Sequence, residues 1–242
     1  MPEQDERRAE LAANLARVRR RIADACAAAG RGRDEVTLVA VTKTYPARDV
    51  LHLASLGVGD VGENRDQEAA PKAAEVRGAG VDVRWHFVGQ LQRNKARSVA
   101  AYADLVHSVD SVRLAMALAE AADRYRESPL DVLVQVSVDG DPARGGARLG
   151  GPPDTDLDQV AEAVAAAGSL RLRGVMTVAP VDWDPGAAFE RLAGIAEALR
   201  VSFPTATVIS AGMSADVESA VEFGATHVRI GSALLGNRAA LR

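Results

Sequence analysis

The sequence has one cysteine and no long apolar stretch, and both absences exclude classes of protein. Because Cys26 is alone among 242 residues, an internal disulfide and a cysteine metal cluster are excluded. His52, His107 and His227 have no spacing typical of a metal site. No apolar stretch is long enough to cross a bilayer, and the charged residues 1–8 lack the apolar core of a signal peptide. We therefore expect a cytoplasmic protein without a bound metal.

The sequence also has no strong excess of one charge. Its net charge is −4, which gives no general drive toward nucleic acid or a membrane surface. A hydrophobic content of 48% and a charged content of 26% are ordinary for a globular protein. The length suits one large domain or two small ones, and we expect one domain over residues 1–242.

Lysine is scarce. Of the 29 basic residues, three are lysines (Lys43, Lys72 and Lys95) and the other 26 are arginines. Because arginine keeps its proton and does not form an imine under ordinary conditions, covalent amine chemistry has only three candidates here. Lys72 and Lys95 fall on helical stretches with polar neighbours, so we expect both side chains to be solvated.

Lys43 ends the most apolar run of the chain. Residues 36–42 are mostly β-branched or aliphatic, which is typical of a strand buried on both faces in a parallel sheet. A lysine at the tip of such a strand has two interpretations. It simply reaches solvent, or it is a desolvated nucleophile that forms a Schiff base.

The chain alternates between strand and helix patterns. Strands are predicted at 36–43, 58–62, 84–88, 104–109, 130–138, 170–178, 206–210 and 226–230. Each predicted strand is followed by a predicted helix. One further helix precedes the first strand and ends near Gly30, and residues 139–153 are predicted to form a long loop. Eight such units predict a (β/α)₈ TIM barrel with an extra N-terminal helix. A doubly wound open sheet is the alternative, but the first strand lacks the glycine-rich turn common in that fold.

In a (β/α)₈ barrel the functional site lies at the carboxyl ends of the strands. Two turns there, Gly212-Met213-Ser214 and Gly231-Ser232, follow the seventh and eighth predicted strands. Loops in these positions often bind phosphate at a helix N-terminus. The alternative is that Ser214 and Ser232 are ordinary helix caps.

Two further side chains lie on predicted strands near this end. Arg229 either pairs with a barrel carboxylate or faces a ligand, where it would keep a heteroaromatic nitrogen unprotonated. His86 either bonds within the site or is a satisfied core histidine. A strand-tip lysine, a phosphate cup and an arginine together suggest pyridoxal phosphate.

Motifs from the first to the eighth predicted strand resemble the pyridoxal phosphate homeostasis protein family, which is similar to the barrel domain of bacterial alanine racemase. They are Leu38-Val39-Ala40-Val41-Thr42-Lys43-Thr44, Gly62-Glu63-Asn64, Trp85-His86-Phe87-Val88-Gly89-Gln90-Leu91-Gln92-Arg93-Asn94-Lys95, Gly174-Val175-Met176, Gly212-Met213-Ser214 and Val228-Arg229-Ile230-Gly231-Ser232.

The resemblance implies pyridoxal 5′-phosphate held as a Schiff base on Lys43. It implies that Arg229 lies near the pyridine nitrogen and that Asn64 and His86 lie close to the cofactor. The phosphate would be surrounded by the two turns, through Ser210, Gly212, Met213, Ser214, Gly231 and Ser232. It also implies a role in cofactor buffering or delivery, with apo-forms of cofactor-dependent enzymes as candidate recipients. We expect a monomer or weak dimer.

The resemblance implies no strong catalytic turnover. Alanine racemase uses a second domain that supplies a tyrosine from the partner subunit, and this sequence ends at Arg242, directly after the predicted barrel. A cationic Arg229 at the ring nitrogen would also weaken the ring as an electron sink. One alternative is a racemase or lyase acting on amino acids, which would need His86 or Tyr45 as its acid/base. Another is a barrel that binds a different phosphorylated metabolite and leaves Lys43 unmodified.

Overall fold

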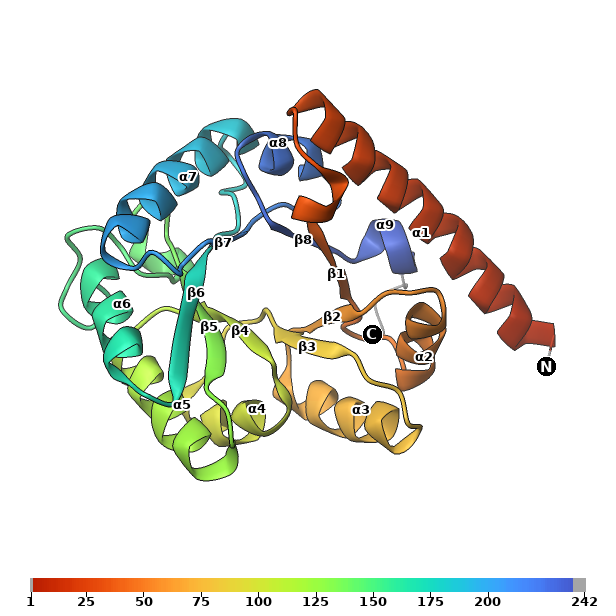
Figure 1. The fold of residues 1–242 in the computed structure, drawn as a ribbon, viewed down its shortest axis with the longest axis horizontal. Coiled ribbons are helices and arrows are strands. Elements are labelled where there is room, and N and C mark those ends of the chain that lie inside the picture. Colours follow the sequence, from red (N-terminus) through yellow and green to blue (C-terminus); the bar gives the residue numbers. More distant parts are fainter. Residues whose placement is uncertain (1, 237–242) are drawn as a thin grey trace.

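The computed structural model describes residues 2–236, which form a closed barrel of eight parallel strands with helices outside it (Figure 1). The strands are β1 (Thr37–Val41), β2 (Asp60–Glu63), β3 (Arg84–Phe87), β4 (Leu105–Val109), β5 (Leu130–Gln135), β6 (Leu170–Met176), β7 (Val208–Ser210) and β8 (His227–Ile230). Each strand pairs with the next, and β8 pairs with β1 through Leu38 with Val228 and Val39 with Arg229. The predicted (β/α)₈ barrel is therefore confirmed.

The helices alternate with the strands as the pattern predicts. They are α1 (Pro2–Ala28), α2 (Ala47–Ser55), α3 (Asp66–Gly78), α4 (Ala96–Tyr102), α5 (Val112–Tyr125), α6 (Leu157–Ala166), α7 (Pro185–Ser202), α8 (Val217–Glu222) and α9 (Ser232–Leu235). Short 3₁₀ turns lie at Arg33–Glu35, Arg93–Lys95 and Pro142–Arg144. The last of these lies within the predicted long loop. None of the described helices is both long and apolar enough to cross a membrane.

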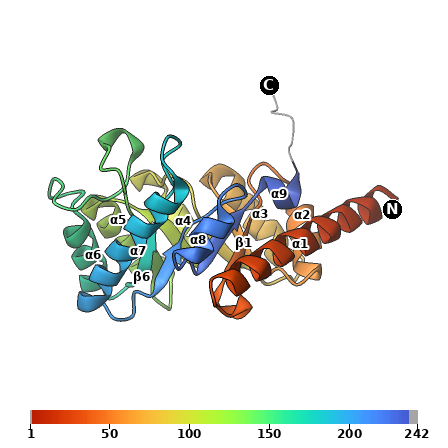
Figure 2. The same cartoon turned by 90° about the horizontal axis from the view of Figure 1, so that it is seen from above.

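The extra helix α1 lies across the outside of the barrel, where the first and last strands meet (Figures 1 and 2). Its apolar face, which consists of Leu11, Leu15, Val18 and Ile22, is buried. It packs against α2, α8 and α9, so it covers elements from both ends of the sequence.

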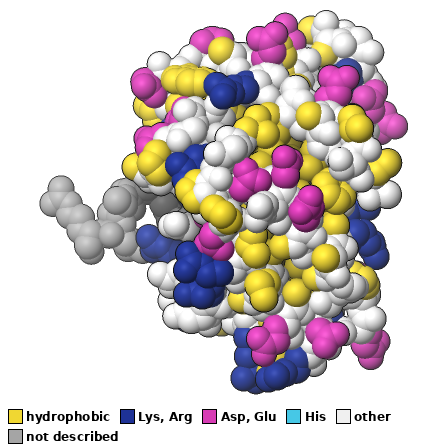
Figure 3. Space-filling view, turned by 90° about the vertical axis from the view of Figure 1, so that its left-hand side faces the viewer, with side chains coloured by type: hydrophobic (Ala, Val, Ile, Leu, Met, Phe, Trp, Pro, Cys, Tyr) yellow, Lys and Arg dark blue, Asp and Glu magenta, His cyan; other side chains and the backbone are white. Residues whose placement is uncertain are grey.

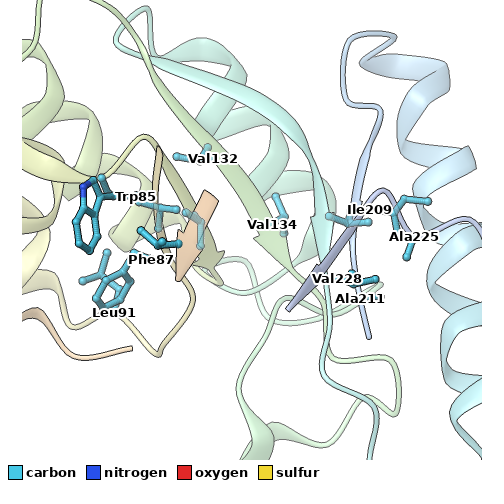
Figure 4. Packing of buried hydrophobic residues seen from close by; sticks show 14 of the residues in the cluster. Trp85, Phe87, Leu91, Val132, Val134, Ile209, Ala211, Ala225 and Val228 are labelled. Atoms are coloured by element: carbon cyan, nitrogen blue, oxygen red, sulfur yellow. The ribbon is translucent and has the colours of Figure 1, made fainter. Parts of the chain in front are cut away.

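Most buried apolar side chains lie between the barrel and its helices. Outward-facing residues such as Trp85 and Phe87 of β3 and Val132 and Val134 of β5 belong to this layer (Figure 4). On the side of the molecule where α6 and α7 lie, charged side chains of both signs are interspersed with exposed apolar ones (Figure 3).

Inside the barrel the side chains divide into two halves. Leu105, Leu133, Met176 and Val208, from β4 to β7, form a small apolar cluster separate from the outer layer. The other half is polar and holds three histidines, from β3, β4 and β8, whose ring centroids are 5.1–6.4 Å apart. Because alternate residues of a barrel strand face inward, a polar residue between two outward-facing apolar ones enters the interior.

Candidate functional site

Lys43 lies on a tight turn just beyond β1. The N–H of Tyr45 donates to the carbonyl of Thr42, 3.1 Å away, so Lys43 and Thr44 are the central residues of the turn. Thr44 has a φ of 67°, the only positive value at a non-glycine residue in the described chain. A positive φ at this position is typical of type II turns and is strained for a β-branched residue. The Lys43 side chain is exposed, so its amine is accessible at the carboxyl-terminal mouth of the barrel.

A buried ion pair fixes the backbone directly before Lys43. The ammonium of Lys72, on α3, donates to the Thr42 carbonyl at 2.8 Å and to Glu63 Oε1 at 2.5 Å. The Thr42 hydroxyl donates to the same carboxylate oxygen at 2.6 Å. Burial raises the pKa of Glu63, while Lys72 and Thr42 act in the opposite direction.

The expectation that Lys72 is solvated is therefore wrong, because its side chain is only 7% exposed. Lys72 lies on the buried face of α3 with Ala69, Ala73 and Val76. Its spacing from these residues is helical, so a signal for burial was present in the sequence. The Lys95 side chain is 33% exposed, and its ammonium is 3.9 Å from Asp66.

The two Gly/Ser turns meet beside the end of β1. The Ser232 hydroxyl donates to the Ser214 hydroxyl at 3.3 Å, and the Ala233 N–H also donates to Ser214 Oγ at 3.3 Å. A Cβ added at Gly231 would lie 3.5 Å from the carbonyl oxygen of Val41, the last residue of β1. The turn after β8 therefore lies next to the end of the strand that leads to Lys43.

Neither serine is the helix cap that the alternative interpretation supposed. The N-cap of α8 is Asp216, and the helix begins three residues after Ser214. The N-cap of α9 is Gly231, and Ser232 is its first helical residue. Among residues 2–236, the N–H groups of Ser214 and Ser232 have no hydrogen-bond acceptor. Such N–H groups can bind an anion.

Gly212 allows the first turn to fold closely on α8. Its φ is 88°, and an added Cβ would lie 2.5 Å from the Cβ of Ala220. Its carbonyl accepts the N–H of Arg229 at 2.9 Å, which joins the turn to β8. Met213 follows it and is 40% exposed.

Helix α1 supports both turns from outside the barrel. Arg21 donates to the carbonyl of Ser214 at 2.9 Å. The buried amide of Asn14 donates to Leu234 at 2.9 Å, and Arg7 donates to Leu235 at 3.1 Å. These acceptors include carbonyls of α9, so α1 satisfies groups that a short helix leaves unpaired.

Arg229 is buried inside the barrel. Its guanidinium donates to the Ser210 hydroxyl at 2.6 Å and to the Thr177 carbonyl at 2.8 Å. The first of the two alternatives, a pairing with a barrel carboxylate, is not found, because none of the described carboxylates forms a salt bridge with Arg229. Burial lowers the pKa of Arg229 to about 10.

His86 is 1% exposed and uses both of its ring nitrogens. Nδ1 is 2.9 Å from His107 Nε2, and Nε2 is 2.9 Å from Asp60 Oδ1. His107 Nδ1 is in turn 2.9 Å from the Ser210 hydroxyl. His86 thus has the hydrogen bonds of a satisfied core histidine. Its connection toward the mouth runs through His107 and Ser210, and its contact with a cofactor stays a prediction.

Asn64 follows β2 directly and is half-buried. The loop after β3 packs against its backbone, since a Cβ at Gly89 would lie 2.1 Å from the Asn64 carbonyl oxygen. Asn64 lines a small pocket with Gln67, Gln90 and Lys95, among others.

The alanine racemase N-terminal domain family matches residues 9–239, nearly the whole sequence. A pyridoxal phosphate homeostasis protein of Mycobacterium tuberculosis is 45% identical over 246 residues, covering 96% of this chain and 95% of the relative. The chain belongs to the pyridoxal phosphate homeostasis protein family. A homeostasis protein of Escherichia coli is 38% identical over 234 residues, covering 95% of this chain and 97% of that relative.

Solved structures agree with this family membership. PipY of Synechococcus elongatus, solved with PLP bound, superposes with a TM-score of 0.76 at 30% identity, covering 93% of this chain and 100% of PipY. An alanine racemase of Corynebacterium glutamicum superposes with a TM-score of 0.66 at 17% identity, covering 97% of this chain and 64% of the racemase. The family and the racemase share the barrel fold.

Proposed function

We propose that this chain binds pyridoxal 5′-phosphate as a Schiff base on Lys43 and takes part in cofactor homeostasis, by buffering or delivery, without strong turnover. The observation that carries the proposal is the exposed amine of Lys43 just beyond β1, next to the paired turns after β7 and β8. The linkage would form between Nζ and the aldehyde carbon, with loss of one water molecule. The homeostasis relatives and the PLP-bound PipY structure support this choice of ligand.

The residues present fit this cofactor. The N–H groups and hydroxyls of Ser214 and Ser232 suit a phosphate, and Gly212, Met213 and Gly231 provide the backbone around them. The Ser210 hydroxyl is engaged by Arg229 and His107, so we assign Ser210 to positioning more than to phosphate binding.

The chemistry that the cofactor supplies is an aldehyde and an electron-withdrawing ring. Arg229, which has no carboxylate partner among the described residues, would keep the ring nitrogen unprotonated through charge repulsion. An unprotonated ring stabilises a carbanion poorly, which favours tethering over catalysis.

The enzyme alternative requires a free acid/base near Lys43. The Tyr45 hydroxyl donates to the carbonyl of Gly236 at 2.7 Å, and both nitrogens of His86 are engaged. These contacts support the homeostasis role. We expect incubation with amino acids in deuterated water to give no rapid α-deuteration; rapid exchange that is lost in His86→Gln or Tyr45→Phe would favour an enzyme instead.

The lysine assignment is tested by absorbance. The protein incubated with pyridoxal phosphate should absorb at about 420 nm, as protonated Schiff bases of this cofactor do, and borohydride should bleach the band. Lys43→Ala should remove the band, while the matched control Lys95→Ala should keep it. A Lys43→Ala protein with an unchanged band would overturn the assignment. Recipient apo-enzymes, a monomeric or weakly dimeric state and a cytoplasmic location stay predictions.

A further inference from the structure

The polar half of the barrel interior contains a continuous row of hydrogen-bonding groups. It begins at Arg229 on β8, passes through Ser210, His107 and His86, and ends at Asp60, the first residue of β2. Each step is 2.6–2.9 Å long. The row therefore connects the carboxyl-terminal mouth, where Lys43 lies, with the amino-terminal mouth on the other side of the barrel.

We propose that Ser210, His107 and His86 form a one-directional hydrogen-bond relay that makes Asp60 a counter-charge of Arg229, in addition to the nearby Asp216. The relay itself is independent of any ligand. Its effect on a bound cofactor rests on the function proposed above. In this proposal Asp60, His86 and His107 are positioning residues, because they act on the mouth through Ser210 and Arg229.

If His86 is neutral, the two ends fix the direction of every bond. An ionised Asp60 can only accept, so Nε2 of His86 must carry a proton. A neutral His86 then accepts at Nδ1, which requires a proton on Nε2 of His107. A neutral His107 accepts at Nδ1, which requires the Ser210 hydroxyl to donate to it. Ser210 can still accept from Arg229, which only donates.

The charges around the relay agree with this assignment. Burial opposes ionisation of Asp60, but the hydrogen bond from His86 and the electrostatic contributions of His86, Arg84 and His227 together outweigh it and lower its pKa. Burial is the main reason why the pKa of His107 lies well below its usual value, with smaller electrostatic contributions from His86 and from the charge of Arg229, so His107 is neutral. His227, at the same interior layer, also has its pKa lowered by burial, to about 4.

The relay adds to the stabilisation of a buried cation that has no carboxylate contact. The charge of Asp216, just before α8, raises the pKa of Arg229, although burial outweighs it. An unpaired charge inside a barrel is strongly disfavoured. Here Asp60, whose side chain is 21% exposed, holds a negative charge at the opposite mouth, and oriented neutral groups transmit its influence to Arg229. In a competing arrangement both nitrogens of His86 carry a proton. His86 then donates to His107, and His107 donates to the Ser210 hydroxyl.

Nitrogen NMR of the histidine rings at neutral pH, without pyridoxal phosphate, decides the direction. We expect Nε2 to be protonated and Nδ1 unprotonated in both His86 and His107. A doubly protonated His86, or a proton on Nδ1 of either ring, would overturn the relay. Because the measurement uses the unmodified protein without ligand, its result does not depend on the proposed function.

Absorbance titration of the loaded protein tests the effect at the mouth. In Asp60→Asn the charge of Arg229 is less compensated, so the Lys43 Schiff base should lose its proton about half a pH unit lower. The control is Asp131→Asn, since Asp131 lies on β5 next to Arg171 and Arg173, outside the relay. An equal shift in both variants, or none in Asp60→Asn, would overturn the relay. A parent protein without the band would instead refute the proposed function and leave the NMR result to decide the relay.

Discussion

Replacing Lys72 with methionine should lower the free energy of unfolding by about 3–5 kcal/mol at pH 8, the range for removing one partner of a buried ion pair. This loss is at the high end of the destabilisation that single substitutions cause, for a reason that is visible in the structure. Glu63 is fully buried, and its Oε2 has no hydrogen-bond partner among the described residues. Without Lys72, only the Thr42 hydroxyl would still donate to this carboxylate.

The loss should depend on pH. Burial already raises the pKa of Glu63, and removal of Lys72 should raise it further. A raised folded-state pKa means that the folded protein binds a proton that the unfolded protein has released. Stability of Lys72→Met should therefore fall as pH rises above the unfolded value of about 4.3, until the folded pKa is passed.

Urea denaturation at pH 5.5 and pH 8 measures both effects. The matched control is Lys95→Met, whose long, partly exposed contact with Asp66 should contribute less than about 1 kcal/mol. The double variant Lys72→Met/Glu63→Gln should recover part of the loss, because no buried charge remains. If the free energy of unfolding of Lys72→Met lies within 1 kcal/mol of that of the parent at both pH values, the buried pair does not stabilise this fold.

Two further predictions concern stability away from the mouth. Gly174→Ala should cost about 3 kcal/mol or more in urea denaturation, because Gly174 has a φ of 149° and an added Cβ would lie 1.9 Å from the carbonyl oxygen of Val208. Gly194→Ala, in open space on α7, should instead gain about 0.5–1 kcal/mol; a loss there would contradict the glycine argument. Acidification should destabilise the protein through His227, whose pKa is lowered to about 4 while the unfolded value is about 6.5. The unfolded chain binds a proton first as pH falls through this window, so stability decreases from pH 6.5 to pH 4, and His227→Gln should reduce that decrease in thermal unfolding.

The alternation of strands and helices was readable from the sequence because it depends on local patterns. Apolar runs such as 36–42 mark strands covered on both faces, and glycines end the helices between them. The strand ends were less accurate. β5 ends at Gln135 and not at residue 138, since the apolar run continues into the loop after pairing with β6 has stopped.

The candidate site was predicted only where its residues lie on motifs or strand tips. Lys43 and the two Gly/Ser turns are of this kind. Lys72 was missed because a lysine on a helix is usually solvated, although it shares a helical face with Ala69 and Val76. The partnership of His107 with His86 was missed as well. This contact depends on which strands are neighbours in the barrel and on which of their side chains face inward. The sequence of a short strand does not determine either of these.

The pairing of β1 with β8 has a consequence for the order in which the protein can acquire a ligand. Lys43 is made early in synthesis, whereas Ser214 and Ser232 come from the last part of the described chain. A partly synthesised chain has the amine but not the turns, and contacts between such distant segments form late in folding. The carbonyl groups that accept from Arg7, Asn14 and Arg21 of α1 lie on α9 and on the turn after β7, so these hydrogen bonds also form only after that part of the chain is made. The mouth is therefore assembled in the finished barrel, and a nascent chain should not capture free cofactor there.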